Sequence, residues 1–153
     1  MTLLSQLLSL NVISENDYKN LEFVDFKGSK INIELNKVYL VVNDMYCHDC
    51  KIIALESLNK YIGDSNYYII LPFRNSAVQR KDKINENKEY NKNIYNYLFC
   101  KPNGYDLKAF LKEVNSPVIF TIREKMLLIT KLFDPESKKN IDSLINYHVE
   151  SLK

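Results

Sequence analysis

The chain has 153 residues, which suits one domain with a sizeable core. Its composition, 46% hydrophobic and 26% charged, is ordinary for a globular protein. The formal net charge of +2 gives no argument for nucleic acid or an anionic membrane as a partner. The longest apolar runs are far shorter than the roughly 20 residues that a membrane span needs. We therefore expect no nucleic-acid partner, no membrane span and a monomer.

Leucines recur through the first ten residues with the spacing of a short amphipathic helix. We expect residues 1–20 to form an N-terminal extension with this helix, and residues 21–153 to form the main domain. No Lys or Arg precedes the leucines and no clean cleavage site follows them, so they do not read as a secretory signal. The compartment stays open: cytoplasmic by default, or periplasmic if a leader preceded this sequence.

The main domain opens with alternating apolar residues that predict two strands, over residues 21–26 and 31–35, with a turn between them. Residues 38–42 are continuously apolar, which indicates a central strand covered on both faces. A helical period follows over residues 51–62, and residues 67–71 form the next buried strand. A strand, a helix and a strand make a βαβ unit, so the two apolar strands are expected to be parallel.

The second half begins with an irregular, basic segment over residues 72–104. A solvated insertion is the plainer interpretation, and an electrostatic guide for a partner is the alternative. A short helix is predicted over residues 105–114, with Leu107, Phe110 and Leu111 facing inward. Residues 118–122 and 126–132 predict an antiparallel hairpin, and a last helix carries Ile141, Leu144, Ile145, His148, Val149 and Leu152 on one stripe.

The sequence Cys47-His48-Asp49-Cys50 lies between the central strand and the first long helix. Two thiols at this spacing can close a reversible disulfide, and the partial positive charge of a helix N-terminus favours a thiolate. A C-x-x-C sequence in this context indicates a redox motif. Cys47 is expected to be exposed, and Cys50, one helical turn later, to be shielded.

Two residues inside the motif have opposed effects on the Cys47 thiolate. His48 stabilises the anion when it is protonated, whereas Asp49 places negative charge near both sulfurs. Cys47, Cys50 and His48 are also competent metal ligands, so metal handling is a rival chemistry. No second pair of ligands exists, and His148 lies on an apolar stripe as a core histidine, so we expect no metal and no cofactor.

The third cysteine, Cys100, follows the apolar run Tyr97-Leu98-Phe99. An odd number of cysteines argues against a scaffold held together by disulfides. Cys100 is therefore expected to be a small buried hydrophobic residue, and a third redox thiol is the alternative.

The order of these elements resembles the thioredoxin fold. More narrowly, it resembles the thiol-disulfide oxidoreductases of bacterial envelopes, the thioredoxin-like group that includes cytochrome-maturation proteins. The resemblance covers about residues 21–152 and rests on Tyr46-Cys47-His48-Asp49-Cys50 and Ser116-Pro117. It implies an α/β three-layer sandwich, with a central mixed β-sheet flanked by helices, an extra N-terminal β-strand pair and an insertion at about 72–104.

The resemblance also implies roles for the motif residues. Cys47 resembles the attacking cysteine, Cys50 the resolving cysteine, and Pro117 the cis-proline that faces the disulfide. Tyr46, Ser116 and Pro117 would then receive the substrate. The chain departs from the family pattern in three places: Tyr46 stands where Trp is usual, Asp49 where Pro is frequent, and Val41 where cytosolic thioredoxins bury an acid.

The expected function is therefore exchange of disulfides through Cys47 and Cys50. The implied partners are a disulfide-bearing protein substrate and a protein that supplies reducing thiols. Two alternatives stay open from the residues alone. One is a thioredoxin-fold binding module with little exchange activity, and the other is a copper or zinc handling protein that uses the same cysteines.

Overall fold

The structure is a computed structural model that describes residues 8–42, 48–63, 66–102, 107, 110, 117–132 and 138–153. Within this part of the chain, the strands are β1 (Leu8–Val12), β2 (Glu22–Val24), β3 (Lys30–Asn32), β4 (Val38–Val41), β5 (Tyr67–Leu71), β6 (Tyr97–Cys100), β7 (Val118–Arg123) and β8 (Met126–Lys131). The helices are α2 (Glu15–Lys19), α3 (His48–Tyr61), α4 (Ala77–Asn85), the 3-10 helix η1 (Ile94–Asn96) and α6 (Lys138–Ser151). Of the described helices, none is long and apolar enough to cross a membrane.

The described strands form one mixed sheet of eight, in the order β1-β8-β7-β4-β5-β6-β2-β3. Strands β4, β5 and β6 run parallel to one another, and β7 runs antiparallel to β4. The predicted βαβ unit is confirmed, because α3 connects β4 to its parallel neighbour β5 with Leu40 opposite Ile69. The predicted N-terminal strand pair is confirmed as the antiparallel pair β2 and β3.

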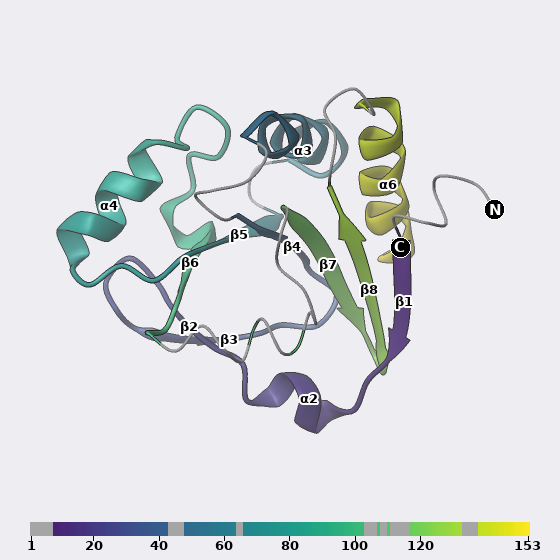
Figure 1. The fold of residues 1–153 in the computed structure, drawn as a ribbon, viewed down its shortest axis with the longest axis horizontal. Coiled ribbons are helices and arrows are strands. Elements are labelled where there is room, and N and C mark those ends of the chain that lie inside the picture. Colours follow the sequence, from purple (N-terminus) through teal and green to yellow (C-terminus); the bar gives the residue numbers. More distant parts are fainter. Residues whose placement is uncertain are drawn as a thin grey trace.

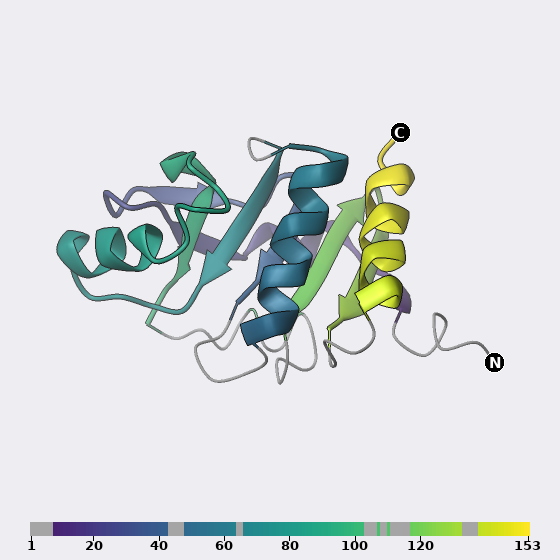
Figure 2. The same ribbon diagram turned by 90° about the horizontal axis from the view of Figure 1, so that it is seen from above.

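Helices cover both faces of the sheet, as the predicted three-layer sandwich requires. Helices α3 and α6 lie side by side on one face, whereas α2 lies beyond the opposite face (Figures 1 and 2). Leu40 belongs to the core cluster beneath α3 and α6, and Tyr39 belongs to the cluster on the other face. Both are at most 1% exposed. Burial on both faces explains why the β4 sequence is continuously apolar, and it stabilises the fold by about 2 kcal/mol per large side chain.

The prediction of a helix over residues 1–10 is wrong for residues 8–10, because these residues belong to strand β1. This strand pairs antiparallel with β8 and places Leu10 opposite Leu128. A short apolar stretch fits either period, and the free backbone groups along the edge of β8 favour a strand. A short helix, α2, does occur within residues 1–20, but later in the chain, where the Ser14 capping box starts it.

The segment over residues 72–104 contains a strand that sequence reasoning missed. Strand β6 pairs in parallel with β5 and antiparallel with β2. Its four residues are too few to show a period. Asn93 caps the 3-10 turn before it, so the local sequence reads as a loop. The insertion is therefore confined to the residues between β5 and β6, which include α4 and η1.

The C-terminal half agrees with the sequence prediction. Strands β7 and β8 form an antiparallel hairpin around Glu124, whose φ of 55° lies in the left-handed region. Helix α6 buries five of the six residues of the predicted stripe, namely Ile141, Leu144, Ile145, His148 and Val149. The sixth, Leu152, follows the helix and is partly buried against the core. Leu107 and Phe110 pack against the opposite face of the sheet, as predicted, and Leu111 lies outside the described residues.

His148 is the core histidine that the sequence predicts. It is fully buried, and its Nε2 lies 2.6 Å from Thr130 Oγ1 while its Nδ1 lies 3.4 Å from Thr121 Oγ1. Both partners are neutral hydroxyl groups. Burial therefore lowers the pKa of His148 to about 3.

This low pKa predicts that stability falls in acid. The unfolded chain protonates His148 near its ordinary pKa of about 6.5, so it binds one more proton than the folded chain between that pH and pH 3. The free energy of unfolding should be fully retained above pH 6.5 and fall by about 1.4 kcal/mol per pH unit below it. Urea titrations at several pH values give the free energy of unfolding as a function of pH. This free energy should fall less steeply below pH 6.5 for His148→Gln than for the parent. An equally steep fall in both proteins would contradict this account.

Candidate functional site

The site is built where strands from different parts of the chain meet at one edge of the sheet. Because β4 and β5 are parallel, their carboxyl ends lie at the same edge. Strand β7 runs the other way and places its first residue, Val118, opposite Val41. Pro117, just before Val118, therefore reaches the same edge, where α3 also begins (Figure 2). The structure thus brings Cys50 and Pro117, far apart in sequence, to one edge.

Cys50 is completely buried in the first turn of α3. It is 0% exposed and packs in the core cluster that includes Val42 and Leu132. It is disulfide-bonded. His48 and Asp49, by contrast, are exposed. The predicted shielding of Cys50 is confirmed, and the two residues before it face solvent.

Pro117 is buried and is held by the strand pair that follows it. Its carbonyl oxygen accepts a hydrogen bond from the Leu132 backbone N–H at 2.8 Å. This bond extends the β7–β8 ladder by one step toward the site. Tyr46, Cys47 and Ser116 lie outside the described residues. The expected cis bond between Ser116 and Pro117 therefore stays a prediction.

A contact that sequence reasoning missed connects α3 to the insertion. Lys51, which follows Cys50, donates from Nζ to Asn87 Oδ1 at 3.2 Å. Asn87 is buried and donates in turn to the carbonyl oxygen of Lys83, in α4. The hydroxyl of Tyr97, in β6, donates to the Asn87 carbonyl oxygen. The first turn of α3 is thus held by a buried asparagine, a residue that the sequence shows only as one of many in an Asn-rich stretch.

A second polar cluster fixes α3 against α6. Asp142 accepts hydrogen bonds from the Tyr61 hydroxyl at 2.6 Å and from the Ser57 hydroxyl at 2.9 Å. The Tyr61 bond is the main reason why the pKa of Asp142 lies below its ordinary value, with Ser57 and Lys60 also lowering it. Charge-assisted hydrogen bonds of this kind are about twice as strong as neutral ones. They set the position of the helix that carries Cys50.

Acid–base groups around Cys50 differ from the family pattern that the sequence resembles. Val41, at the position of the family's buried acid, is itself a buried core residue. Among the described residues, Asp25 is the buried carboxylate, and it accepts hydrogen bonds from the backbone N–H groups of Lys27 and Ser29 in its own turn. Asp25 therefore has a structural role. The described residues supply no buried carboxylate for proton transfer to Cys50.

Cys100 is a free thiol on the other face of the sheet from Cys50. It lies opposite Phe23 across the β2–β6 pair and packs against the cluster that includes Leu98. It is half-buried, whereas the sequence predicted a buried residue. Burial raises the pKa of its thiol to about 11. A thiol in this state is a poor nucleophile near neutral pH.

Metal ligands do not gather elsewhere in the described part of the chain. No group of three or more His, Cys, Asp or Glu side chains there could hold a metal ion. His148, one candidate from the sequence, has both ring nitrogens next to threonine hydroxyl groups. A metal site at the motif would need Cys47 and so lies outside what the structure describes.

No family model matches the chain, and no curated protein matches it. Solved structures do match. A secreted disulfide oxidoreductase of Mycobacterium tuberculosis, homologous to E. coli DsbE, aligns with a TM-score of 0.54 at 8% identity and covers 88% of this chain and 99% of that one. Peroxidoxin BcpB of the same organism aligns with a TM-score of 0.54 at 9% identity, over 94% of this chain and 96% of that one.

Peroxiredoxin Q of Xanthomonas campestris gives a TM-score of 0.54 at 7% identity, over 94% of this chain and 97% of its own. These structural neighbours are thioredoxin-fold redox proteins. At such low identities, the likeness concerns the course of the backbone and not the residues of the site.

The raised pKa of Cys100 predicts slow alkylation in the folded protein. At pH 8 a thiol with a pKa of about 11 carries roughly a hundredfold less thiolate than an ordinary cysteine. Iodoacetamide should therefore modify Cys100 far more slowly in the reduced, folded protein than in urea, as measured by mass spectrometry. Cys100→Ala should lower the free energy of unfolding by only about 1 kcal/mol. Rapid alkylation of folded Cys100 would contradict its assignment as a packing residue.

Proposed function

Since this chain has the thioredoxin-like fold, we propose that it is a thiol-disulfide oxidoreductase that works through Cys47 and Cys50. One observation carries the proposal: Cys50 is buried, disulfide-bonded and placed in the first turn of α3, at the sheet edge that Pro117 also reaches. The fold by itself hosts many activities, so the argument rests on this cysteine.

The partner of Cys50 follows from the cysteine count. The chain has three cysteines, and Cys100 is free. Cys47 is the remaining candidate, so we infer a Cys47–Cys50 disulfide. A bridge between these positions encloses two residues, His48 and Asp49, and both are exposed. The disulfide would then lie at the boundary between the core and solvent.

The reaction in the reducing direction starts with both thiols free. The Cys47 thiolate attacks one sulfur of a substrate disulfide, so a mixed disulfide forms and the other substrate sulfur leaves as a thiolate that takes up a proton. Cys50, after losing its proton, attacks the Cys47 sulfur and releases the second substrate thiol. Two electrons have then passed to the substrate, and the Cys47–Cys50 disulfide awaits a reducing thiol.

Burial separates the roles of the two cysteines. Because Cys50 is 0% exposed, the sulfur of another protein cannot reach it directly. It can attack only a disulfide formed at its neighbour in the motif. Cys47 is therefore the attacking cysteine, and Cys50 the resolving one. The partners are a disulfide-bearing protein substrate and a protein that supplies thiols.

We propose that Tyr46, Ser116 and Pro117 bind the substrate. Pro117 has no N–H, and its carbonyl oxygen is used by Leu132. The Ser116 backbone is therefore the group there that we propose for pairing with an extended substrate segment. His48 and Asp49 face solvent and would modulate the thiolate rather than bind substrate.

Variants of the two cysteines test their roles. With Cys50→Ser, the mixed disulfide on Cys47 cannot be resolved, so disulfide-linked partners should accumulate. With Cys47→Ser, the buried Cys50 should trap none. Non-reducing gels after acid quenching make the comparison, with Cys100→Ala as the matched control. Equal trapping by both variants would reject the role assignment.

Insulin reduction by the parent separates an oxidoreductase from a binding module that uses the same fold. An active parent supports the proposal. An inactive parent in which the thiols of Cys47 and Cys50 are both reduced favours the binding module. Metal analysis of protein purified without oxygen tests the copper and zinc alternative.

Charge within the motif predicts a second pair of effects. A carboxylate disfavours a nearby anion, so Asp49→Asn should lower the pKa of Cys47 and raise the reduction potential of the disulfide. His48→Ala should raise the Cys47 pKa by less, because an imidazole favours a nearby anion only in its protonated form. Both side chains are exposed, so both effects should weaken at high salt. Thiolate absorbance against pH gives the values. A Cys47 pKa in Asp49→Asn at or above that of the parent would refute this electrostatic account.

A further inference from the structure

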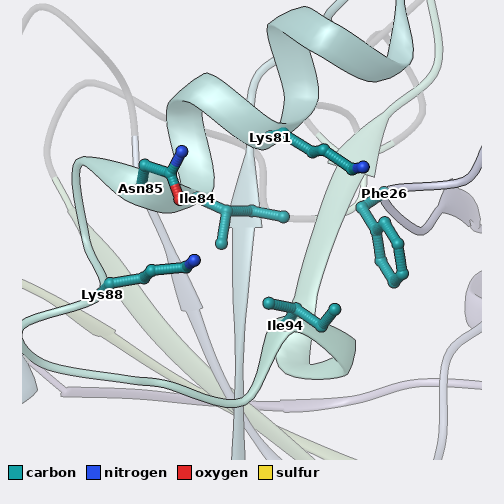
Figure 3. Close-up of a pocket in the computed structure, with 6 residues that line it drawn as sticks. All are labelled: Phe26, Lys81, Ile84, Asn85, Lys88 and Ile94. Atoms are coloured by element: carbon teal, nitrogen blue, oxygen red, sulfur yellow. The ribbon is translucent and has the colours of Figure 1, made fainter.

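A pocket of about 250 Å³ lies between helix α4, the 3-10 helix η1 and the turn after β2, apart from the cysteine site (Figure 3). Six residues line it: Phe26, Lys81, Ile84, Asn85, Lys88 and Ile94. None of them has a place in the disulfide chemistry proposed above. The pocket therefore needs an explanation of its own.

The floor of the pocket is apolar and is held in place by its surroundings. Ile84 comes from α4, Ile94 from η1 and Phe26 from the turn after β2, and the three surround a common space (Figure 3). Ile84 and Phe26 belong to the core cluster, and the Phe26 ring meets the Tyr95 ring edge to face at 5.4 Å. The floor is thus preformed, which lowers the entropy cost of binding.

The backbone of Phe26 is also fixed to α4. Arg80 donates from Nε to the Phe26 carbonyl oxygen at 2.9 Å and from Nη1 to the Arg74 carbonyl oxygen at 3.3 Å. Arg80 therefore connects the turn after β2 to the helix that forms the other wall. The two walls keep their separation without a ligand between them.

The rim of the pocket is positively charged. Lys81 and Lys88 are exposed, and neither ammonium group makes an ion pair or hydrogen bond within the described part of the chain. Lys83, on another side of α4, is by contrast paired with Glu86 at 3.1 Å. No acidic residue lines the pocket, and Asn85 adds an amide. Two cations beside an apolar floor favour an anion with an apolar body.

We propose that this pocket binds a small amphipathic carboxylate. A water molecule occupies about 30 Å³ in the liquid, so the pocket has room for roughly eight to ten non-hydrogen atoms. The apolar body would cover Phe26, Ile84 and Ile94. The carboxylate would pair with a lysine of the rim, Lys81 or Lys88. An inorganic anion would pair with the lysines without using the apolar floor, and a neutral alkane would leave the lysines without a partner.

Octanoate, which has ten non-hydrogen atoms, is the probe. Nitrogen–proton NMR spectra of the full chain would be recorded during titration with octanoate, and separately with octan-1-ol and with acetate. Octanoate should shift the amide signals of residues 26, 81–88 and 94, and should bind at least severalfold more tightly than either control compound. Higher salt should weaken octanoate binding and leave octan-1-ol unaffected.

The double variant Lys81→Gln, Lys88→Gln tests the rim. Both side chains are exposed, so the fold should be retained, and octanoate binding should weaken by roughly tenfold. Lys92→Gln is the matched control, because Lys92 is exposed in the same segment and does not line the pocket. Its affinity should equal that of the parent.

Four outcomes would overturn the proposal. They are absence of octanoate binding in the parent, octan-1-ol binding as tightly as octanoate, an equal loss of affinity in Lys92→Gln, and signal shifts confined to residues outside the pocket. None of these outcomes bears on the disulfide chemistry, which the cysteine variants test separately.

Discussion

The parallel pairing of β4 with β5 beneath α3 is the constraint on which the rest of the structure depends. The crossover between these adjacent parallel strands consists of α3, which starts at the carboxyl edge of β4. The side chains of β4 are then buried on both faces. The position of Cys50 follows from this arrangement, because it lies in the first turn of that helix.

Two sets of polar contacts hold α3 in place, and a neighbouring strand brings Pro117 to the site. Asp142 receives hydrogen bonds from two residues of α3 and fixes the helix against α6. Lys51 connects its first turn to buried Asn87 in the insertion. Strand β7, antiparallel to β4, delivers Pro117 to the same edge. The helix also packs against the core through Ala54, Leu55 and Leu58.

The insertion has two separable effects in this molecule. Asn87, just beyond α4, supports the helix that carries Cys50, whereas Lys81 of α4 and Lys88 after it border a pocket with an apolar floor. The pocket and the cysteine therefore share a supporting segment without sharing any lining residue. A ligand in the pocket would contact α4, and α4 contacts Asn87 through the Lys83 carbonyl oxygen.

The sequence by itself determined the central elements of this protein. Continuous apolar runs define β4 and β5, and a helical period defines α3 and α6, because burial on two faces or on one stripe leaves a local pattern. The position of the cysteine motif between a strand and a helix follows from the same patterns. Only the tertiary structure decided the features that depend on contacts between distant parts of the chain. Strands β1 and β6 exist because neighbouring strands offer unpaired backbone groups. The Lys51–Asn87 bond and the pocket join segments far apart in the chain, and local sequence patterns do not predict contacts of this kind.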